Sequence, residues 1–360
     1  MDLMIFTTAI LKEVKIMNKI KNENQTISGP SNSKGFLKRL RNEDTAAHPF
    51  TVILNKEIAD HMRSWRFLIL IAIIVFTCMA SLYTALTNMA NVVKPGDPEG
   101  TFFFLKLFTI SDNTVPAFLV FITFIGPLLG ISLGFDAVNS EQNKGTLSRV
   151  LSQPIHRDYL LNAKFLGALS VIAIMFFALG FLVIGIGLIT LGIPPTAEEF
   201  LRIMLFILLS IIYVAFWLNL SILFSVLFRQ PATSALSGIS VWLFFSVFYT
   251  MIVNLLTRGL NPGNYAQEWQ IIRYTEMKLN LMRLMPNQLF SEATTTILVP
   301  SVRSLGPLSV DQYYGAIPGP LPIGQSLMLV WPQVTGLISA TIVCFVISYI
   351  SFMKREIRSR

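Results

Sequence analysis

The stretch that decides the fold is "FLGALSVIAIMFFALGFLVIGIGLITL", residues 165–191, which contains no Asp, Glu, Lys or Arg. A helix needs about 20 apolar residues to cross the hydrocarbon core of a bilayer. A charged side chain at the centre of such a helix costs on the order of 2.5–3.5 kcal/mol. We therefore interpret this stretch as a transmembrane helix.

Windows of the same kind recur along the chain. Residues without a charged side chain extend over 67–93, 113–135, 165–197, 203–228, 230–257 and 312–353. These windows predict transmembrane helices near 67–88, 115–135, 165–191, 203–228, 234–256 and 327–352. A membrane β-barrel would instead need strands of about ten residues with alternating polarity. We expect an all-α membrane protein whose six-helix transmembrane domain covers residues 67–353.

The composition and the charge distribution support this interpretation and give an orientation. Only 13% of the residues are charged and 53% are hydrophobic, whereas soluble domains carry about 25% charged residues. Lys and Arg in short loops mark the cytoplasmic side of a membrane. They gather in 34–66, in 136–164, at Arg229 and in the tail 354–360. We therefore expect a multi-pass protein of a prokaryotic cell membrane with both termini cytoplasmic, and an external loop at 257–326.

The net charge of +8 does not indicate a nucleic-acid partner. The basic residues follow the expected topology and are not interleaved with aromatic residues on one soluble domain. Residues 1–48, rich in Asn, Ser, Lys and Arg from residue 20 onwards, are expected to form a disordered cytoplasmic tail.

The expected spans lack the residues that membrane enzymes and ion-coupled carriers need. The histidines, His48, His61 and His156, all lie outside the uncharged windows. The cysteines, Cys78 and Cys344, are interpreted as packing residues. A Gly-Lys dipeptide does not occur in the sequence, so the chain has no Walker A loop. We expect no catalytic residue, no metal ligand and no cofactor, and any energy for transport must come from another subunit.

A polar segment, "DAVNSEQNKGTLSRVLSQPIHRDYLLNAK", residues 136–164, interrupts the uncharged windows. Its apolar residues at helical spacing are Leu147, Val150 and Leu151. Its more polar side carries Glu141, Lys144 and Arg149. Pro154 ends this short helix, and a second helix begins near Asp158. Docking of a soluble partner and packing on the lipid surface both fit this pattern.

A second amphipathic stretch, residues 49–66, precedes the first span. Its apolar positions are Phe50, Leu54, Ile58, Met62 and Trp65. The polar positions on its other side are Lys56, Glu57, Asp60 and Arg63. The pattern predicts an interfacial elbow helix on the cytoplasmic surface of the bilayer, with Trp65 and Arg66 anchoring the turn into the first span.

Several stretches together resemble ABC-2 type transporter permeases, most closely the branch associated with multicopper-enzyme maturation, which includes nitrous-oxide-reductase maturation permeases. The resemblance covers about residues 48–357. It is carried by "NKEIADHMRSWRF", "LFRQPATSALSGISVW", "LMPNQLFSEAT", "VWPQ" and "SFMKREI". The polar segment resembles the coupling segment of that family at Glu141, Gly145, Thr146, Leu147, Leu151, Pro154, Arg157 and Lys164.

This resemblance implies a mechanism and a set of partners. Two permease subunits, in a homodimer or a heterodimer, would pair in the membrane above two ABC ATPase subunits. The helix 145–153 would insert into a groove of the ATPase as a coupling helix. Its apolar contacts would be Leu147, Val150 and Leu151, and its electrostatic contacts Glu141 and Arg157. Closure of the ATPases on nucleotide would then rock the spans.

Two functions remain open at this point. The chain is either the permease subunit of an ATP-driven transporter or a non-transporting subunit that passes ATPase strokes to an external partner through loop 257–326. A candidate external helix in that loop is "QIIRYTEMKLNLMRLM", residues 270–285, whose apolar periodicity is imperfect and equally fits packing on the membrane.

Overall fold

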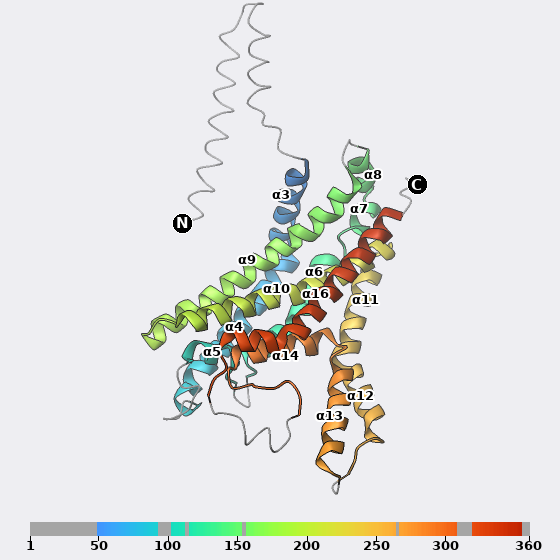
Figure 1. Ribbon diagram of the computed structural model, residues 1–360. Coiled ribbons are helices and arrows are strands. Elements are labelled where there is room, and N and C mark those ends of the chain that lie inside the picture. Colours follow the sequence, from blue (N-terminus) through green and yellow to red (C-terminus); the bar gives the residue numbers. More distant parts are fainter. Residues whose placement is uncertain are drawn as a thin grey trace, which may run out of the picture. The chain divides into compact units, whose positions relative to one another are not determined.

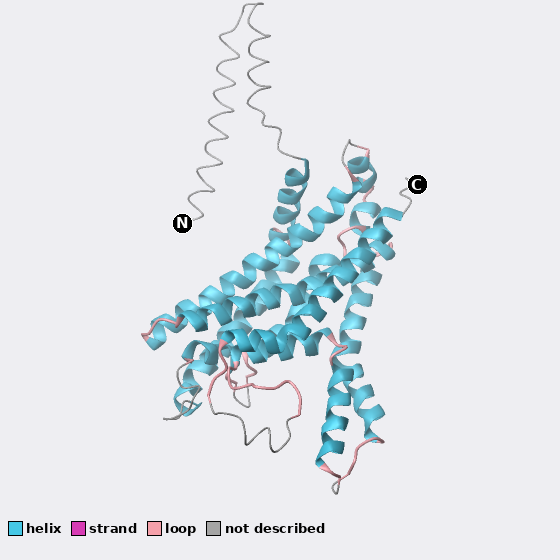
Figure 2. Ribbon diagram, in the orientation of Figure 1, coloured by secondary structure: helices cyan, strands magenta, loops and turns pink. Residues whose placement is uncertain are grey.

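The computed structural model describes residues 49–92, 102–111, 115–152, 156–263, 266–307 and 319–354. Within these ranges the regular structure is helical and there is no β-strand (Figure 2). The expected tail at 1–48 lies outside the described residues, as does the expected tail at 354–360 except for Lys354, which ends the last helix.

Among the described residues, six helices are long and apolar enough to cross a membrane, and this confirms the predicted fold class. The described spans are α4 (Trp65–Val92), α6 (Phe118–Gly134), α9 (Arg157–Leu191), α10 (Ala197–Leu227), the compound span Pro231–Arg258, and α16 (Ile323–Lys354). Helix α9 has 35 residues, which corresponds to about 52 Å. It therefore begins well before the uncharged window and contains the end of the polar segment.

Helix α10 is the most buried of the spans and lies at the centre of the bundle, beside α6, α9 and α16 (Figure 1). Helix α6 approaches it through two glycines. A Cβ atom on Gly130 would lie 2.7 Å from the carbonyl oxygen of Val214, and one on Gly134 would lie 2.8 Å from that of Leu218. Small residues permit such close helix contact in membranes. The sequence "GPLLGISLG" thus fixes how α6 and α10 pack.

A helix, α3 (Pro49–Met62), covers most of the predicted elbow at 49–66, and its location at the membrane surface stays a prediction. A turn at residues 63–64 separates it from α4, which begins at Trp65. Trp65 is 79% exposed, as expected for an anchor at the membrane–water interface. Along its length α3 packs against the first half of α9 (Figure 1).

The span Pro231–Arg258 differs from the others because it is interrupted. It consists of α11 (Pro231–Leu243), a π-helical turn η1 (Phe244–Phe248) and α12 (Tyr249–Arg258). Only a small share of this span is buried in the chain, in contrast to α10. Figure 1 shows α12 running beside α13 (Glu268–Met282), away from the other spans.

The expected external loop 257–326 is not simply a loop. It contains α13 and α14 (Pro286–Leu298). The start of α14 contacts Tyr213, near the middle of α10, and its end contacts Arg202, near the outer end of α10. Helix α14 therefore runs antiparallel to α10, from the middle of that helix towards its N-terminal end. The external location of residues 257–326 stays a prediction. A further short helix, α5 (Phe103–Thr109), is held at the same end, where its Phe104 N–H donates to Glu199.

Candidate functional site

The polar segment between the second and third spans folds into two short helices, α7 (Asn139–Asn143) and α8 (Thr146–Leu151). The turn between them contains Gly145 with φ of +69°, a conformation that glycine adopts without steric cost. The Thr146 hydroxyl donates to the carbonyl oxygen of Glu141 over 3.2 Å and closes the turn. The short helix predicted at 145–153 is therefore present, but shorter.

This segment is fastened to the C-terminal end of α10. The hydroxyl oxygen of Ser225 accepts hydrogen bonds from the N–H groups of Val138 (2.9 Å) and Asn139 (3.2 Å). The Asn143 side chain donates to the carbonyl oxygen of Arg229 over 3.0 Å, just beyond α10. The N–H groups that begin α7 would otherwise lack a partner. Ser225 therefore sets where the segment sits on α10.

A buried ion cluster joins the segment to two other elements. The Lys164 ammonium group, on α9, lies 2.7 Å from Glu141 Oε1 on α7 and 3.2 Å from each carboxylate oxygen of Glu57 on α3. Lys56 lies 3.2 Å from Glu57 Oε1 and 3.7 Å from Glu141 Oε1. We call Lys56, Glu57, Glu141 and Lys164 the inner cluster, because the topology expected from the sequence places this end of the bundle in the cytoplasm. Two cations and two anions balance in it, so the cluster as a whole is neutral.

Burial makes the inner cluster sensitive above all to the loss of Lys164 or Glu57. The side chain of Lys164 is 4% exposed and that of Glu57 is 8% exposed, whereas that of Lys56 is 57% exposed. Burial alone would raise the pKa of Glu57, but the ammonium groups of Lys164 and Lys56 lower it overall. Burial alone would lower the pKa of Lys56, but the carboxylates of Glu57 and Glu141 raise it overall. Glu57 and Lys56 are therefore held in their charged forms.

The position of Glu57 corrects one sequence expectation. The helical pattern placed it with Lys56, Asp60 and Arg63 on the side facing water, but Glu57 faces α9. Helix α3 approaches α9 closely there, because a Cβ atom on Gly167 would lie 3.0 Å from Glu57 Cβ. The physical reason is Lys164, whose buried charge needs a carboxylate partner.

Some of the other elbow residues pack against the protein, and others are exposed on its surface. Ile58 packs on the core, while Met62 and Arg63 are exposed. The Arg66 guanidinium lies 2.7 Å from Asp136 Oδ2 and 5.0 Å from the centre of the Phe135 ring. The turn into the first span is thus tied to the end of α6 by an ion pair and a cation–π contact.

The predicted docking residues also divide. Lys144, Gly145, Thr146, Arg149 and Arg157 are exposed. Leu147, expected to form an apolar contact with a partner, is 2% exposed and packs in the core of this chain. Glu141 is engaged within the chain by Lys164. Val150 and Leu151 belong to α8, but their side chains, and all of Pro154, lie outside the described residues.

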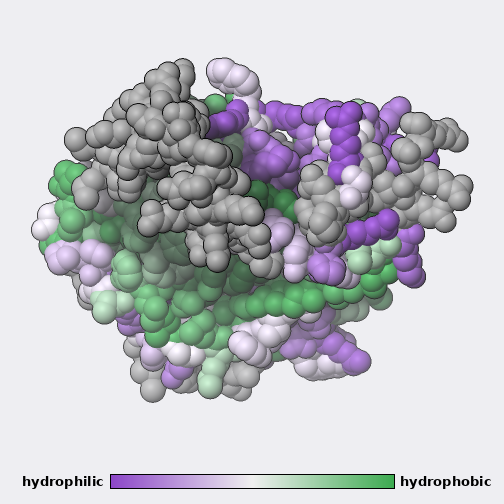
Figure 3. All heavy atoms as spheres, turned by 90° about the horizontal axis from the view of Figure 1, so that it is seen from above, coloured by the Kyte–Doolittle hydropathy of each residue, from purple (hydrophilic) through white to green (hydrophobic). Residues whose placement is uncertain are grey.

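Figure 3 views the molecule from the end where α3, α7 and α8 lie, and shows hydrophilic patches beside a band of hydrophobic residues. The exposed basic side chains of the segment, Lys144, Arg149 and Arg157, belong to this end. A cationic face next to a membrane-embedded bundle suits an acidic surface on a soluble partner.

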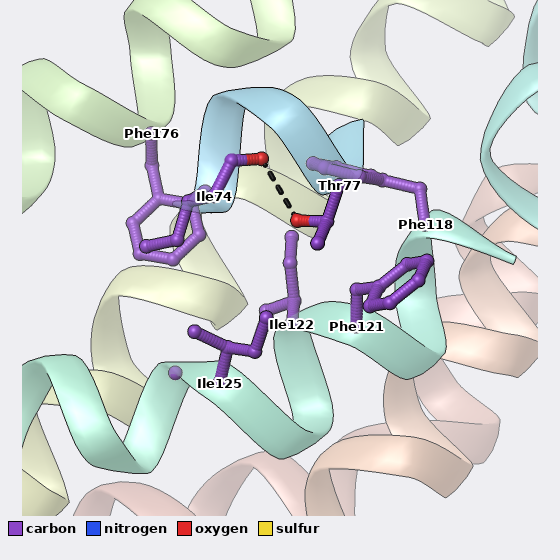
Figure 4. A pocket seen from close by; sticks show the side chains of 8 residues that line it. Ile74, Thr77, Phe118, Phe121, Ile122, Ile125 and Phe176 are labelled. Atoms are coloured by element: carbon purple, nitrogen blue, oxygen red, sulfur yellow. Dashed lines mark hydrogen bonds between the residues drawn. The ribbon is translucent and has the colours of Figure 1, made fainter. Parts of the chain in front are cut away.

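The apolar pocket in Figure 4 lies between α4, α6 and α9. It is lined by Ile74, Thr77, Phe118, Phe121, Ile122, Ile125, Gly126 and Phe176. The Thr77 hydroxyl donates to the carbonyl oxygen of Ile74 over 3.0 Å, so its proton is satisfied within its own helix. The pocket therefore suits apolar groups. Among the described residues no group of three His, Cys, Asp or Glu side chains could hold a metal ion.

A second buried charged residue lies at the opposite end of α10. It was not identified from the sequence as a functional or structural residue. The Arg202 guanidinium is fully buried and contacts α14, α16, the residues before α16 and its own helix. Its acceptors are the carbonyl oxygens of Ile297 (2.8 Å) and Leu321 (2.6 Å), Ser326 Oγ (3.2 Å) and Glu198 Oε1 (2.9 Å). We call this arrangement the outer clamp. Arg202 stands one residue before an uncharged window. In the sequence it therefore resembles the charged residues that commonly flank a transmembrane helix.

Two comparisons place the chain among known proteins. Residues 51–357 match the family model described as "ABC-2 family transporter protein". The chain is also 27% identical over 210 residues to the probable ABC transporter permease protein NosY of Pseudomonas aeruginosa, an alignment that covers 55% of this chain and 67% of that protein.

Proposed function

The chain belongs to the ABC-2 transporter family, and from this premise we propose that it is a permease subunit that couples ATP hydrolysis in a separate ATPase to the movement of a substrate across the cell membrane. Its α7–α8 segment is the docking element. The observation that carries the proposal is the inner cluster, in which Glu141 of the docking element is ion-paired to Lys164 of a transmembrane helix.

The inner cluster gives a displacement of the docking element a physical route into the bundle. A shift of α7 moves Glu141 against Lys164 on α9, and Lys164 also holds Glu57 on α3. The hydrogen bonds to Ser225 deliver the same shift to α10. Because these contacts are short and mostly buried, α7, α9, α3 and α10 respond together.

ATP acts through unequal binding. An ATPase dimer that binds one permease conformation more tightly than another shifts the population between them, and hydrolysis resets the preference. The permease supplies the surface to which the ATPase binds. This surface includes Lys144, Arg149 and Arg157, all of which are exposed. The assembly contains two permease and two ATPase subunits, and the end with α7 and α8 faces the cytoplasm together with both termini.

Co-purification with the ATPase tests this proposal. The tagged chain is co-expressed with its ABC ATPase, extracted in mild detergent and captured. The triple variant Lys144→Glu, Arg149→Glu and Arg157→Glu should lose the ATPase, while Lys354→Glu, an exposed charge at the inner end of α16, should retain it. Retention of the ATPase by the triple variant at native stoichiometry would contradict the docking assignment.

A second candidate function is force transmission to an external partner. It is favoured by α13, which has no buried side chain and carries the exposed residues Trp269, Ile271 and Met277. Transport assays in vesicles separate the two. A chain that only transmits force stimulates ATP hydrolysis when the external partner binds, without any substrate crossing the bilayer.

A further inference from the structure

A partly buried polar node ties the interrupted span to the bundle at the π-helical turn. The Tyr213 hydroxyl, on α10, lies 2.9 Å from the carbonyl oxygen of Thr123 on α6 and 2.7 Å from Asn287 Oδ1 at the start of α14. The Asn287 amide nitrogen donates to Ser246 Oγ, within η1, over 2.9 Å. The Tyr213 ring, fully buried, stacks on Phe290 at 4.3 Å.

The two halves of the interrupted span pack on different parts of the molecule. The inner half, α11, packs on α6: Trp242 lies edge-to-face on Phe124 at 4.9 Å, and a Cβ atom on Gly238 would lie 3.1 Å from Ile131. The outer half, α12, contacts the end of α13, where the Tyr249 hydroxyl donates to the carbonyl oxygen of Leu281 over 2.9 Å. The halves meet at η1.

A π-helical turn is a natural place for such a division. It inserts an extra residue into the hydrogen-bond ladder and is found at functional sites and at sharp bends. The side chains within η1 are not buried, so bending there displaces little packed core. The turn therefore permits α12 to change direction while α11 stays on α6.

Helix α14 supplies the fixed end of the node. Its outer end is held by Arg202 through the carbonyl oxygen of Ile297. Its middle is held through Glu292, whose carboxylate accepts hydrogen bonds of 2.9 Å from Gln333 on α16 and from Arg283. With α14 secured to α10 and α16, Asn287 stays with the bundle. The Asn287–Ser246 bond then joins a fixed element to a movable one.

We propose that α12 and α13 form a lever that pivots at η1 and at residues 283–285, where Arg283 keeps its ion pair with Glu292, and that the Asn287–Ser246 hydrogen bond is the latch that holds the η1 end of the lever against the bundle. A hydrogen bond between two neutral side chains is weak, so a modest strain on span five opens it. The latch rests on the structure alone, whereas its opening during the ATPase cycle rests on the proposed function above.

Pulsed electron–electron distance measurements on spin labels test the lever. Labels go on Glu276→Cys in α13 and Met328→Cys in α16, both exposed, in a chain carrying Cys78→Ala and Cys344→Ala. The latch variant is Ser246→Ala, and the matched control is Ser237→Ala, whose hydroxyl bonds Thr233 within the same span. Tyr213→Phe, which loosens Asn287 from the bundle side, is a second test.

The permease alone should give one main distance, with a second population raised on the order of two- to tenfold in Ser246→Ala, as expected for the loss of one neutral hydrogen bond. Ser237→Ala should match the parent. Identical distributions in parent, Ser246→Ala and Tyr213→Phe would overturn the latch, whatever the ATPase does.

A second arm uses the permease–ATPase complex trapped with ATP and vanadate. The parent should then populate the distance that Ser246→Ala shows without nucleotide. An unchanged distribution in a complex that contains the ATPase would overturn the role of the lever in the cycle. Failure of the ATPase to co-purify would count against the proposed function, while the first arm still decides the latch.

Discussion

The outer clamp and the inner cluster are each centred on a buried cation that joins several helices. The two cations differ in the groups that accept their hydrogen bonds. Arg202 donates to two backbone carbonyl groups, of Ile297 and Leu321, together with Ser326 and Glu198. Lys164 donates to the side-chain carboxylates of Glu57 and Glu141. Arg202 is thus held in part by backbone groups, whereas Lys164 is held by flexible side chains.

This difference assigns different mechanical roles to the two ends of the bundle. Backbone acceptors cannot leave Arg202 unless α14 or the residues before α16 move as a whole. Carboxylates can rotate and exchange partners, and the inner cluster offers a second cation, Lys56, within 3.7 Å of Glu141. The outer end is therefore held firmly in place, whereas the contacts of the inner end can rearrange, as the proposed coupling requires.

The largest effect is expected from Arg202→Met. The substitution leaves two buried carbonyl oxygens without a donor, at about 1–3 kcal/mol each. We expect a loss of stability on the order of 3 kcal/mol or more, measured as a lower melting temperature in detergent. Arg273→Met, at an exposed position on α13, is the control. A variant that melts with the native protein would show that the outer clamp does not hold α14.

A somewhat smaller effect is expected from Lys164→Met. Breaking a buried pair costs about 3–5 kcal/mol, but Lys56 remains near both carboxylates and partial exposure screens Glu141, so we expect about 2–3 kcal/mol. The variant should also lose ATPase stimulation in the complex, which Arg202→Met should retain wherever it folds.

The rescue variant sharpens this prediction. Glu57→Gln added to Lys164→Met removes one uncompensated anion, so the double variant should melt above Lys164→Met alone. Lys144→Met, at an exposed position, is the matched control and should be neutral. Additive losses in the double variant would mean that Lys164 and Glu57 are not coupled.

The spans were predictable because hydrocarbon excludes charge, so the uncharged windows marked them directly. The polar segment was also predictable, as an interruption between two windows. The contacts that the segment makes with other parts of the same chain were not predictable. Helical periodicity placed Glu57 on the water side, because the residue that attracts it, Lys164, lies 107 residues away in the chain. Local spacing carries no information about such a pair.

The outer end was harder to predict for a related reason. Helix α14 has 13 residues and contains Glu292, so it is too short and too polar to register as a span. Its place beside α10 depends on Arg202, which stands just outside an uncharged window. Leu147 was assigned to a partner because periodicity identifies an apolar face without identifying what covers it.

A weaker effect is expected from pH, and only at the inner end. Burial lowers the pKa of His61 below its ordinary value of 6.5, in surroundings that include Glu57, Lys164, Asp136 and Asp60. The folded elbow therefore favours neutral imidazole. Its contribution to stability is complete above pH 6.5 and declines as pH falls. Glu57, with a lowered pKa, adds a loss only below its ordinary value of 4.5.

Melting curves between pH 7.5 and about 5.5 isolate the histidine contribution. The native protein should lose melting temperature across this range, and His61→Gln should flatten the curve. Hydrogen exchange should increase in α3 but not in α14. An unchanged slope in His61→Gln would assign the pH response to other groups.

The smallest effect is expected from Gly145→Ala, in the turn between α7 and α8. A Cβ atom there would meet nothing within 4 Å, so the cost comes only from the positive φ, about 1 kcal/mol. Gly259→Ala is the control, since that glycine has φ of −70° and equally open surroundings. Gly145→Asn should be milder than Gly145→Ala, because Asn tolerates the left-handed region.

The readout that matters for Gly145→Ala is the coupling between permease and ATPase rather than global melting. A strained turn changes the angle at which α8 meets its partner, while Glu141 and Lys164 keep their contact. ATPase stimulation should therefore fall in Gly145→Ala more than in Gly259→Ala, at nearly equal melting temperature. If both variants stimulate the ATPase like the native chain, the orientation of α8 is not what the partner reads, and transmission would have to begin at α7 or at Arg157 instead.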